Sequence, residues 1–137
     1  MANELYTAAK EDFLTGNLNL SSNTIKIILV DNAVYTQATA HTSLADVPDV
    51  AKVATANLTN TSVTGGVFDA DDVTFTAVTG ANCEALIIYH DKSADGYANS
   101  TMRLIAYIDT ATGLPILPNG GDITVRFSSA NTKIFAL

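Results

Sequence analysis

Tryptophan is missing from this chain and cysteine occurs once, as Cys83. A single thiol forms no internal disulfide and supplies no cysteine-based metal cluster, so stability has to come from packing or from association. The thiol usage is typical of a reducing compartment. Without an indole, the exposed aromatic surface that carbohydrate-binding modules commonly use is restricted to tyrosine and phenylalanine.

Basic residues are few. The chain has 7 Lys and Arg against 14 Asp and Glu, which gives a net charge of -7 at pH 7. The basic residues stand singly along the sequence, as Lys10, Lys26, Lys52, Lys92, Arg103, Arg126 and Lys133. Because this charge repels phosphate backbones, we expect no direct nucleic-acid partner.

Long hydrophobic runs are also missing. No stretch approaches the roughly 20 apolar residues that cross a bilayer, and the first residues lack the basic start and apolar run of a signal peptide. We therefore expect a protein with no membrane partner that is made in the cytoplasm of a cell. A chain of 137 residues that is 47% hydrophobic and 15% charged is typical of one folded domain.

The chain does contain residue patterns that are typical of β-strands. Residues 85–89 and 104–108 are apolar at nearly every position, which indicates strands covered on both faces at the centre of a sheet. Other segments with strand pattern lie at 24–30, 50–59, 61–68, 73–78 and 123–127, and apolar residues at 133–137 close the chain. The spacing predicts an all-β fold, either an antiparallel β-sandwich or a jelly-roll-like barrel.

Two details of these strands are specific enough to test. Gly65 and Gly66 interrupt the 61–68 segment and predict a bulge or a turn there. In the 73–78 segment, the alternation predicts that Val73, Phe75 and Ala77 point inward.

One short helix precedes the strands. The pattern predicts it over residues 4–15, with Asn3 as its N-cap and Gly16 as its stop. Leu5, Ala9 and Phe13 share its narrow apolar face, so the helix either lies on the sheet or serves as an arm on a neighbouring molecule.

We accordingly divide the chain into an N-terminal helix or arm, residues 1–20, and a single β domain, residues 21–137. If this division is right, deleting the residues before Gly16 should leave the β domain folded. Two long loops are further candidates for contacts. Residues 33–49 suit a surface loop with a helical turn near Ser43, and residues 109–121 are rich in turn formers.

Acidic clusters provide the candidates for metal binding. Residues 91–96 resemble the opening of a calcium-binding loop, but the twelfth position is Met102, where a bidentate glutamate is needed. Asp69, Asp71 and Asp72 form a second cluster in a turn before a strand. An Asp/Gly-rich hairpin loop and a solvated turn explain these clusters better, and we predict no metal site.

Catalytic residues are not predicted either. His41 and His90 are isolated, no nucleophile motif is present, and Cys83 precedes an apolar strand, as a small buried residue would. We predict no catalytic residue, no cofactor and no enzymatic activity. A pocket in which either histidine lies next to one of the carboxylates at 69–72 would instead favour an enzymatic function.

A resemblance to a known family spans nearly the whole chain. Its segments are YTAAKEDFLTG at 6–16, IKIILVD at 25–31, GVFDADDVTF at 66–75, EALIIY at 84–89 and LIAYID at 104–109. This succession resembles a family of small virion structural proteins from tailed bacteriophages. The resemblance implies a capsid decoration, or cement, protein on the capsid surface of the virion.

Such a protein binds between major capsid subunits and stabilises the head, and the resemblance implies self-association as a homotrimer. The N-terminal residues Leu5, Tyr6 and Phe13 are the first candidates for protein contact. Two alternatives stay open. One is a head-to-tail or tail structural component. The other is a carbohydrate- or host-surface-binding module, for which Tyr35 and Tyr97 are the aromatics in expected loops.

Overall fold

The computed structural model describes residues 4–109, 114–127 and 134–136. The described part is mostly β, with antiparallel sheets and one short N-terminal α-helix, α1 (Thr7–Thr15). Short 3₁₀ turns occupy the loops, as η1 (Leu44–Asp46), η2 (Asp49–Ala51), η3 (Ser93–Asp95) and η4 (Asn99–Thr101).

The main sheet has five strands in the order β1-β8-β7-β2-β3, and every neighbouring pair is antiparallel. Along the chain these strands are β1 (Glu4–Leu5), β2 (Ile25–Val30), β3 (Lys52–Asn57), β7 (Ala85–His90) and β8 (Leu104–Ile108). Every residue of β7 is buried, and so are the first four residues of β8. The prediction that these two apolar runs lie at the centre of the fold is confirmed.

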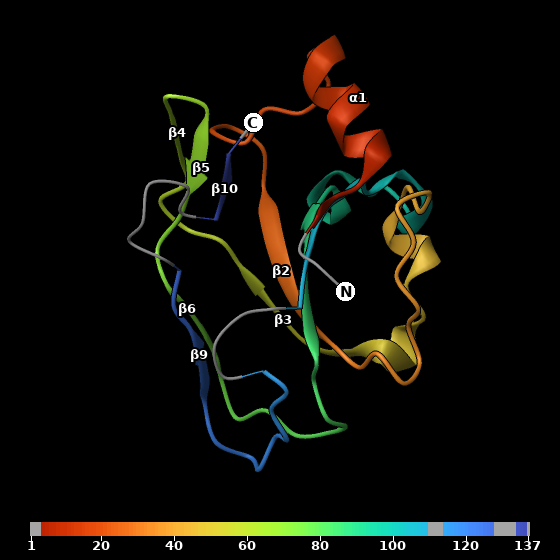
Figure 1. The fold of residues 1–137 in the computed structure, drawn as a ribbon, viewed down its shortest axis with the longest axis vertical. Coiled ribbons are helices and arrows are strands. Elements are labelled where there is room, and N and C mark those ends of the chain that lie inside the picture. Colours follow the sequence, from red (N-terminus) through yellow and green to blue (C-terminus); the bar gives the residue numbers. More distant parts are fainter. Residues whose placement is uncertain (1–3, 110–113, 128–133, 137) are drawn as a thin grey trace.

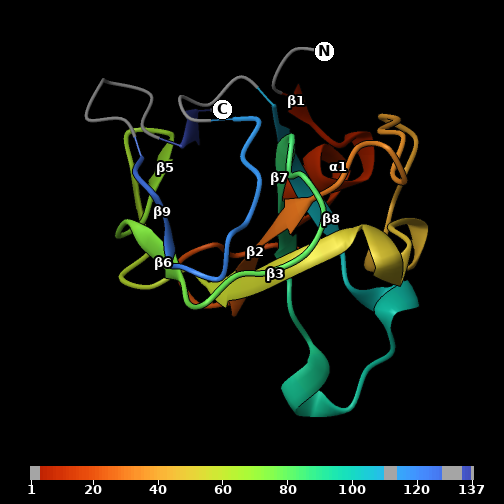
Figure 2. The ribbon, with the colours of Figure 1, turned by 90° about the horizontal axis from the view of Figure 1, so that it is seen from below.

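Two smaller sheets lie together beside the main sheet, on the side away from the 33–49 loop (Figures 1 and 2). One is three-stranded in the order β10-β5-β4, and the other pairs β6 with β9. Their strands are β4 (Ser62–Thr64), β5 (Val67–Asp69), β6 (Val73–Phe75), β9 (Ile123–Val125) and β10 (Phe135–Ala136). None of the sheets in the described residues closes into a barrel, so the barrel alternative is not formed.

The N-terminal helix is shorter than predicted. It begins at Thr7, because Glu4 and Leu5 form β1 and pair with Tyr107 and Ala106 at the open edge of β8. Asn3, the expected N-cap, lies outside the described residues. The stop is confirmed, since Gly16 adopts the left-handed conformation with φ +80°.

The 61–68 segment folds as a hairpin of β4 and β5 around Gly65 and Gly66, which have φ angles of +61° and +79°. The predicted turn is therefore confirmed, since two successive positive φ angles are what a tight two-residue hairpin loop requires.

The prediction for the 73–78 segment is confirmed for Val73 and Phe75 and wrong for Ala77. Val73 and Phe75 are buried, but β6 ends at Phe75, and Ala77 is exposed with φ +49°. The Ala77 N–H donates to Asp122 Oδ1 at 2.9 Å. This turn breaks the alternation, so Val78 is buried in place of Ala77.

Candidate protein-contact surface

Tyr6, one of the three predicted contact residues, is buried inside its own chain. Its side chain is 0% exposed, and its backbone N–H donates to the Ile105 carbonyl at 3.0 Å. The Tyr6 hydroxyl lies 2.9 Å from the Tyr35 hydroxyl, which in turn lies 2.8 Å from His41 Nδ1. Tyr6 thus has no free surface for another molecule, and it fixes the N-terminal segment to the core.

Burial governs the chemistry of this tyrosine pair. Desolvation raises the pKa of Tyr6 far above its ordinary value and raises the pKa of Tyr35 to about 12. Both phenols are therefore neutral at physiological pH. They act as hydrogen-bonding core residues and not as acids or bases.

Leu5, the second predicted contact residue, lies in β1 at the edge of the main sheet. It is partly buried against the core and pairs with Ala106 of β8. It lines a groove of about 370 Å³, here called the β1 groove, together with Glu4, Lys10, Ala106, Tyr107, Ile108, Ile134 and Phe135.

Phe13 lies in a different groove. Its ring centroid is 6.3 Å from that of Phe135, whose ring is 5.3 Å from Phe68. These rings belong to a groove of about 340 Å³, here called the hairpin groove, lined by Phe13, Gly16, Leu18, Asn19, Leu20, Ser21, Val63, Gly66, Phe68 and Phe135. None of these lining residues carries a charge.

Two large apolar side chains on the elements that form this groove are exposed. Leu14, which follows Phe13 on α1, is 88% exposed, and Val63, which lines the groove, is 52% exposed. Large apolar side chains that gather at a groove commonly mark a contact surface. The sequence pattern did not single out either residue, because Leu14 lies off the apolar face of the predicted helix and Val63 lies in a short alternating segment.

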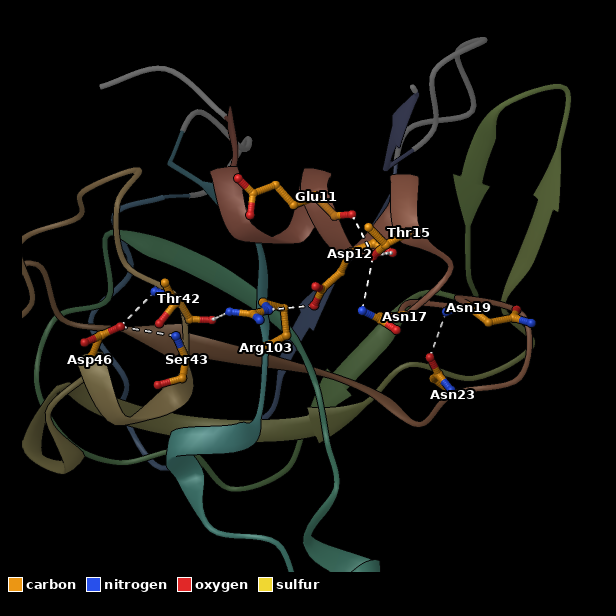
Figure 3. A network of polar contacts seen from close by, with 10 residues as sticks. All are labelled: Glu11, Asp12, Thr15, Asn17, Asn19, Asn23, Thr42, Ser43, Asp46 and Arg103. Carbon is orange, nitrogen blue, oxygen red and sulfur yellow. Dashed lines mark hydrogen bonds and ion pairs between the residues drawn. The ribbon is translucent and has the colours of Figure 1, made fainter.

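A polar network fastens α1 to the main sheet and to the 33–49 loop (Figure 3). Arg103 Nε lies 2.7 Å from Asp12 Oδ2, and Arg103 Nη1 donates to the Thr42 carbonyl at 3.0 Å. On the loop, Asp46 Oδ2 accepts the backbone N–H groups of Thr42 and Ser43 at 2.8 and 3.2 Å. The contact surface on α1 is therefore held in a fixed position.

The helical turn predicted near Ser43 is confirmed as η1, and Asp46 closes its capping box. The hydrogen bond from the Thr42 backbone N–H is the main reason that the pKa of Asp46 is lowered. The carboxylate form of Asp46 is thus the one that stabilises the loop.

The two histidines lie apart from both grooves. His41 contacts Tyr35, whereas His90 is buried at the end of β7, and this burial lowers its pKa. Neither histidine lines the β1 groove or the hairpin groove. Neither of these two grooves therefore holds a histidine next to a carboxylate at 69–72, the arrangement that would favour an enzymatic function.

Carboxylates of the two acidic clusters accept hydrogen bonds from backbone N–H groups and from nearby side chains. Asp91 accepts the backbone N–H and the hydroxyl of Ser93, both at 3.0 Å, and its Oδ2 lies 3.4 Å from Lys26 Nζ. Asp71 Oδ2 accepts from Asn60 Nδ2 at 2.6 Å, and Asp72 Oδ1 accepts the Phe127 N–H at 2.9 Å. Within the described part of the chain, no three metal-ligating side chains of the His, Cys, Asp or Glu type gather at one point.

Cys83 is fully buried beside β7, as the sequence predicts. Its backbone N–H donates to the Ile116 carbonyl at 2.8 Å. Burial, helped by Glu84 and Asp31, raises the pKa of the thiol to about 11. At neutral pH the side chain is therefore a protonated core residue with little nucleophilic character.

Comparison of the sequence with protein-family models and with curated proteins finds no match. Among the described residues, no helix has the length and apolar composition that a membrane span requires.

Proposed function

We propose that this chain is a bacteriophage virion structural protein, and specifically a capsid decoration protein that binds between major capsid subunits and stabilises the head. In this proposal the β scaffold, of sandwich type, presents a contact surface on the outside of the virion. The observation that carries the proposal is the uncharged hairpin groove, together with the exposed side chain of Leu14, which follows the groove residue Phe13 on α1.

The sequence resemblance supports the same class. Its segments coincide with α1, β2, β7 and β8 and with the stretch that contains β5 and β6. These elements build most of the core, and the segments at 6–16 and 66–75 also contain part of the contact surface, namely Phe13, Leu14, Gly66 and Phe68. The contact residues are inferred from exposure and from the groove.

Binding energy is available at this surface without any reactive chemistry. Burying one exposed Leu side chain contributes about 1.5–3 kcal/mol, and each attached copy repeats that contribution. A protein that binds the assembled shell and not the free subunits shifts the equilibrium toward the shell by its binding free energy. The homotrimer implied by the resemblance would strengthen attachment further through avidity.

The N-terminal contact proposal now rests on Leu5 and Phe13, which line the two grooves, together with Leu14. Tyr6 contributes indirectly, because it anchors the segment that carries these residues. The net charge of -7 favours a capsid surface with exposed basic residues as the partner.

The alternatives predict other surfaces. A carbohydrate-binding module needs exposed aromatic side chains, but Tyr35 is buried. Tyr97 is 54% exposed, and Lys92 Nζ lies 5.5 Å from the centre of its ring. Tyr97 is thus the one aromatic from the expected loops that is exposed. A head-to-tail or tail component uses the same kind of apolar contact, and its position on the particle distinguishes it.

The test compares purified phage particles made with and without this chain. A fluorescent DNA dye reports the temperature at which each particle releases its genome. We expect particles without the chain to release DNA at a lower temperature and added wild-type chain to restore stability. A Leu14→Glu chain should restore it poorly, whereas Val50→Glu, a matched change at an exposed site in η2, should restore it fully. Equal release temperatures with and without the chain would contradict the proposal.

A further inference from the structure

The β4–β5 hairpin ends the three-stranded sheet with an open edge. β4 is the outer strand in the order β10-β5-β4, and within the described residues no strand pairs with its other side (Figure 1). All three residues of β4 are exposed. An open strand edge offers unpaired backbone groups, which are a template for another strand.

The register of the hairpin shows which backbone groups are available. Thr64 lies opposite Val67 across the two-residue turn, and Val63 lies opposite Phe68. In a hairpin of this type the pair beside the turn is hydrogen-bonded, so the next pair is not. The N–H and carbonyl of Val63 therefore point away from β5, toward the open edge.

The side chain of Val63 faces the hairpin groove. Residues directly opposite one another in a sheet share a face, so Val63 lies on the same face as buried Phe68, and both line the groove. A strand added at the β4 edge would extend this face and place its own side chain at the rim of the groove.

The composition of the edge differs from that of the rest of the chain. Residues 53–68 contain no charged residue and no proline, and this is the longest uncharged stretch of a chain with a net charge of -7. Charged residues and proline are the usual means of blocking an edge strand. Because the chain as a whole is acidic, a strand edge without charged residues repels a second copy less than an acidic edge would.

We propose that β4 pairs antiparallel with β4 of a second copy of this chain, about a two-fold axis at Val63. The edge is self-complementary in that register. Val63 lies opposite Val63 of the second copy, where the two residues exchange both backbone hydrogen bonds, and Ser62 lies opposite Thr64. The pairing joins the two three-stranded sheets into one and sets both hairpin grooves on the same face.

This inference gives copies in pairs, in place of the homotrimer implied by the resemblance. It does not depend on the proposed function, because it concerns the isolated chain, whereas attachment is measured on particles. Failure of one therefore leaves the other standing.

The first experiment is sedimentation equilibrium of the full chain at concentrations from about 1 to about 100 µM, the range in which a small interface associates. We expect a monomer–dimer equilibrium for the wild type. Val63→Lys places like charges directly opposite each other and should weaken dimerisation at least about tenfold. Val50→Lys makes the same change at a site that is 76% exposed and should behave as wild type.

A second experiment does not depend on the folding of the lysine variant. Cα atoms of a hydrogen-bonded antiparallel pair are about 5.5 Å apart, within the range that disulfides span. Val63→Cys should therefore form a disulfide-linked dimer under mild oxidation, whereas Val50→Cys should not, and Cys83 is buried in both.

A wild-type chain that stays monomeric throughout the concentration range would overturn the pairing. So would a dimer or trimer that Val63→Lys forms as readily as wild type, or a Val50→Cys variant that crosslinks as fast as Val63→Cys.

Discussion

Replacing Tyr6 with alanine should destabilise the whole domain, although Tyr6 stands in the segment that the sequence assigned to a detachable arm. The side chain is 0% exposed, its hydroxyl contacts Tyr35, and its backbone joins the segment to Ile105. If the arm were separate, truncating Tyr6 would affect attachment and leave the unfolding of the β domain unchanged.

The expected loss can be estimated from the burial. Truncating a fully buried aromatic residue to alanine costs about 3–5 kcal/mol, because transfer energy is lost and a cavity is left. The Tyr35 hydroxyl loses one partner but keeps His41 Nδ1 at 2.8 Å, so no large additional penalty is expected. The free energy of unfolding of a small domain is about 5–15 kcal/mol, so the variant loses a large share of its stability.

Urea denaturation followed by circular dichroism measures this loss. With a slope of about 2 kcal/mol per molar urea, the midpoint of Tyr6→Ala should fall by about 1.5–2.5 M. Leu14→Ala is the matched control in the same segment, since its side chain is 88% exposed, and its stability should change by less than about 0.5 kcal/mol. Equal midpoints for the two variants would refute the assignment of Tyr6 to the core.

Three further predictions concern the elements around the contact surface. Arg103→Gln should lower the free energy of unfolding, measured by urea denaturation, by about 1 kcal/mol. A double-mutant cycle with Asp12→Asn should assign most of this loss to the ion pair between the two side chains, and additive losses would contradict that pairing. Asp46→Ala should cost about 0.5–1 kcal/mol at pH 7 through the loss of the η1 cap. Because the pKa of Asp46 is lowered in the fold, its contribution is present above the unfolded-state pKa, so the difference from wild type should shrink below about pH 4, and a difference that persists at pH 2 would count against the cap. Cys83 should resist a thiol reagent at pH 8 until urea unfolds the chain, and rapid labelling of the folded protein would show that it is accessible.

The sequence predicts the centre of this fold well, because burial on both faces leaves a local signal. β7 and β8 are apolar at nearly every position, and no amphipathic alternative competes with that pattern. The turn at Gly65 and Gly66 is equally local, since glycine readily adopts the positive φ angles found there.

The N-terminal segment shows what a local pattern misses. Glu4 and Leu5 carry no strand signal of their own, and they form β1 because β8, about a hundred residues later in the chain, offers an open edge. The burial of Tyr6 likewise depends on a distant partner, the Tyr35 hydroxyl. Tertiary contacts of this kind decide between an arm and a core element, and no window of neighbouring residues contains them.

The candidate site was predictable only in part. Phe13 has an apolar helix position that indicates packing, but its groove requires Phe135 and the β4–β5 hairpin, which lie far along the chain. The exposure of Leu14 depends on how α1 is rotated against β8, and the Asp12–Arg103 ion pair helps to fix that rotation. Periodicity alone does not determine it.

Electron cryomicroscopy of the native phage particle tests the central proposal most directly. We expect density for this β domain on the outer surface of the head, seated between major capsid subunits with Leu14 and the hairpin groove facing the shell. Density confined to the tail, or a particle that contains no copy of the chain, would contradict the assignment to capsid decoration.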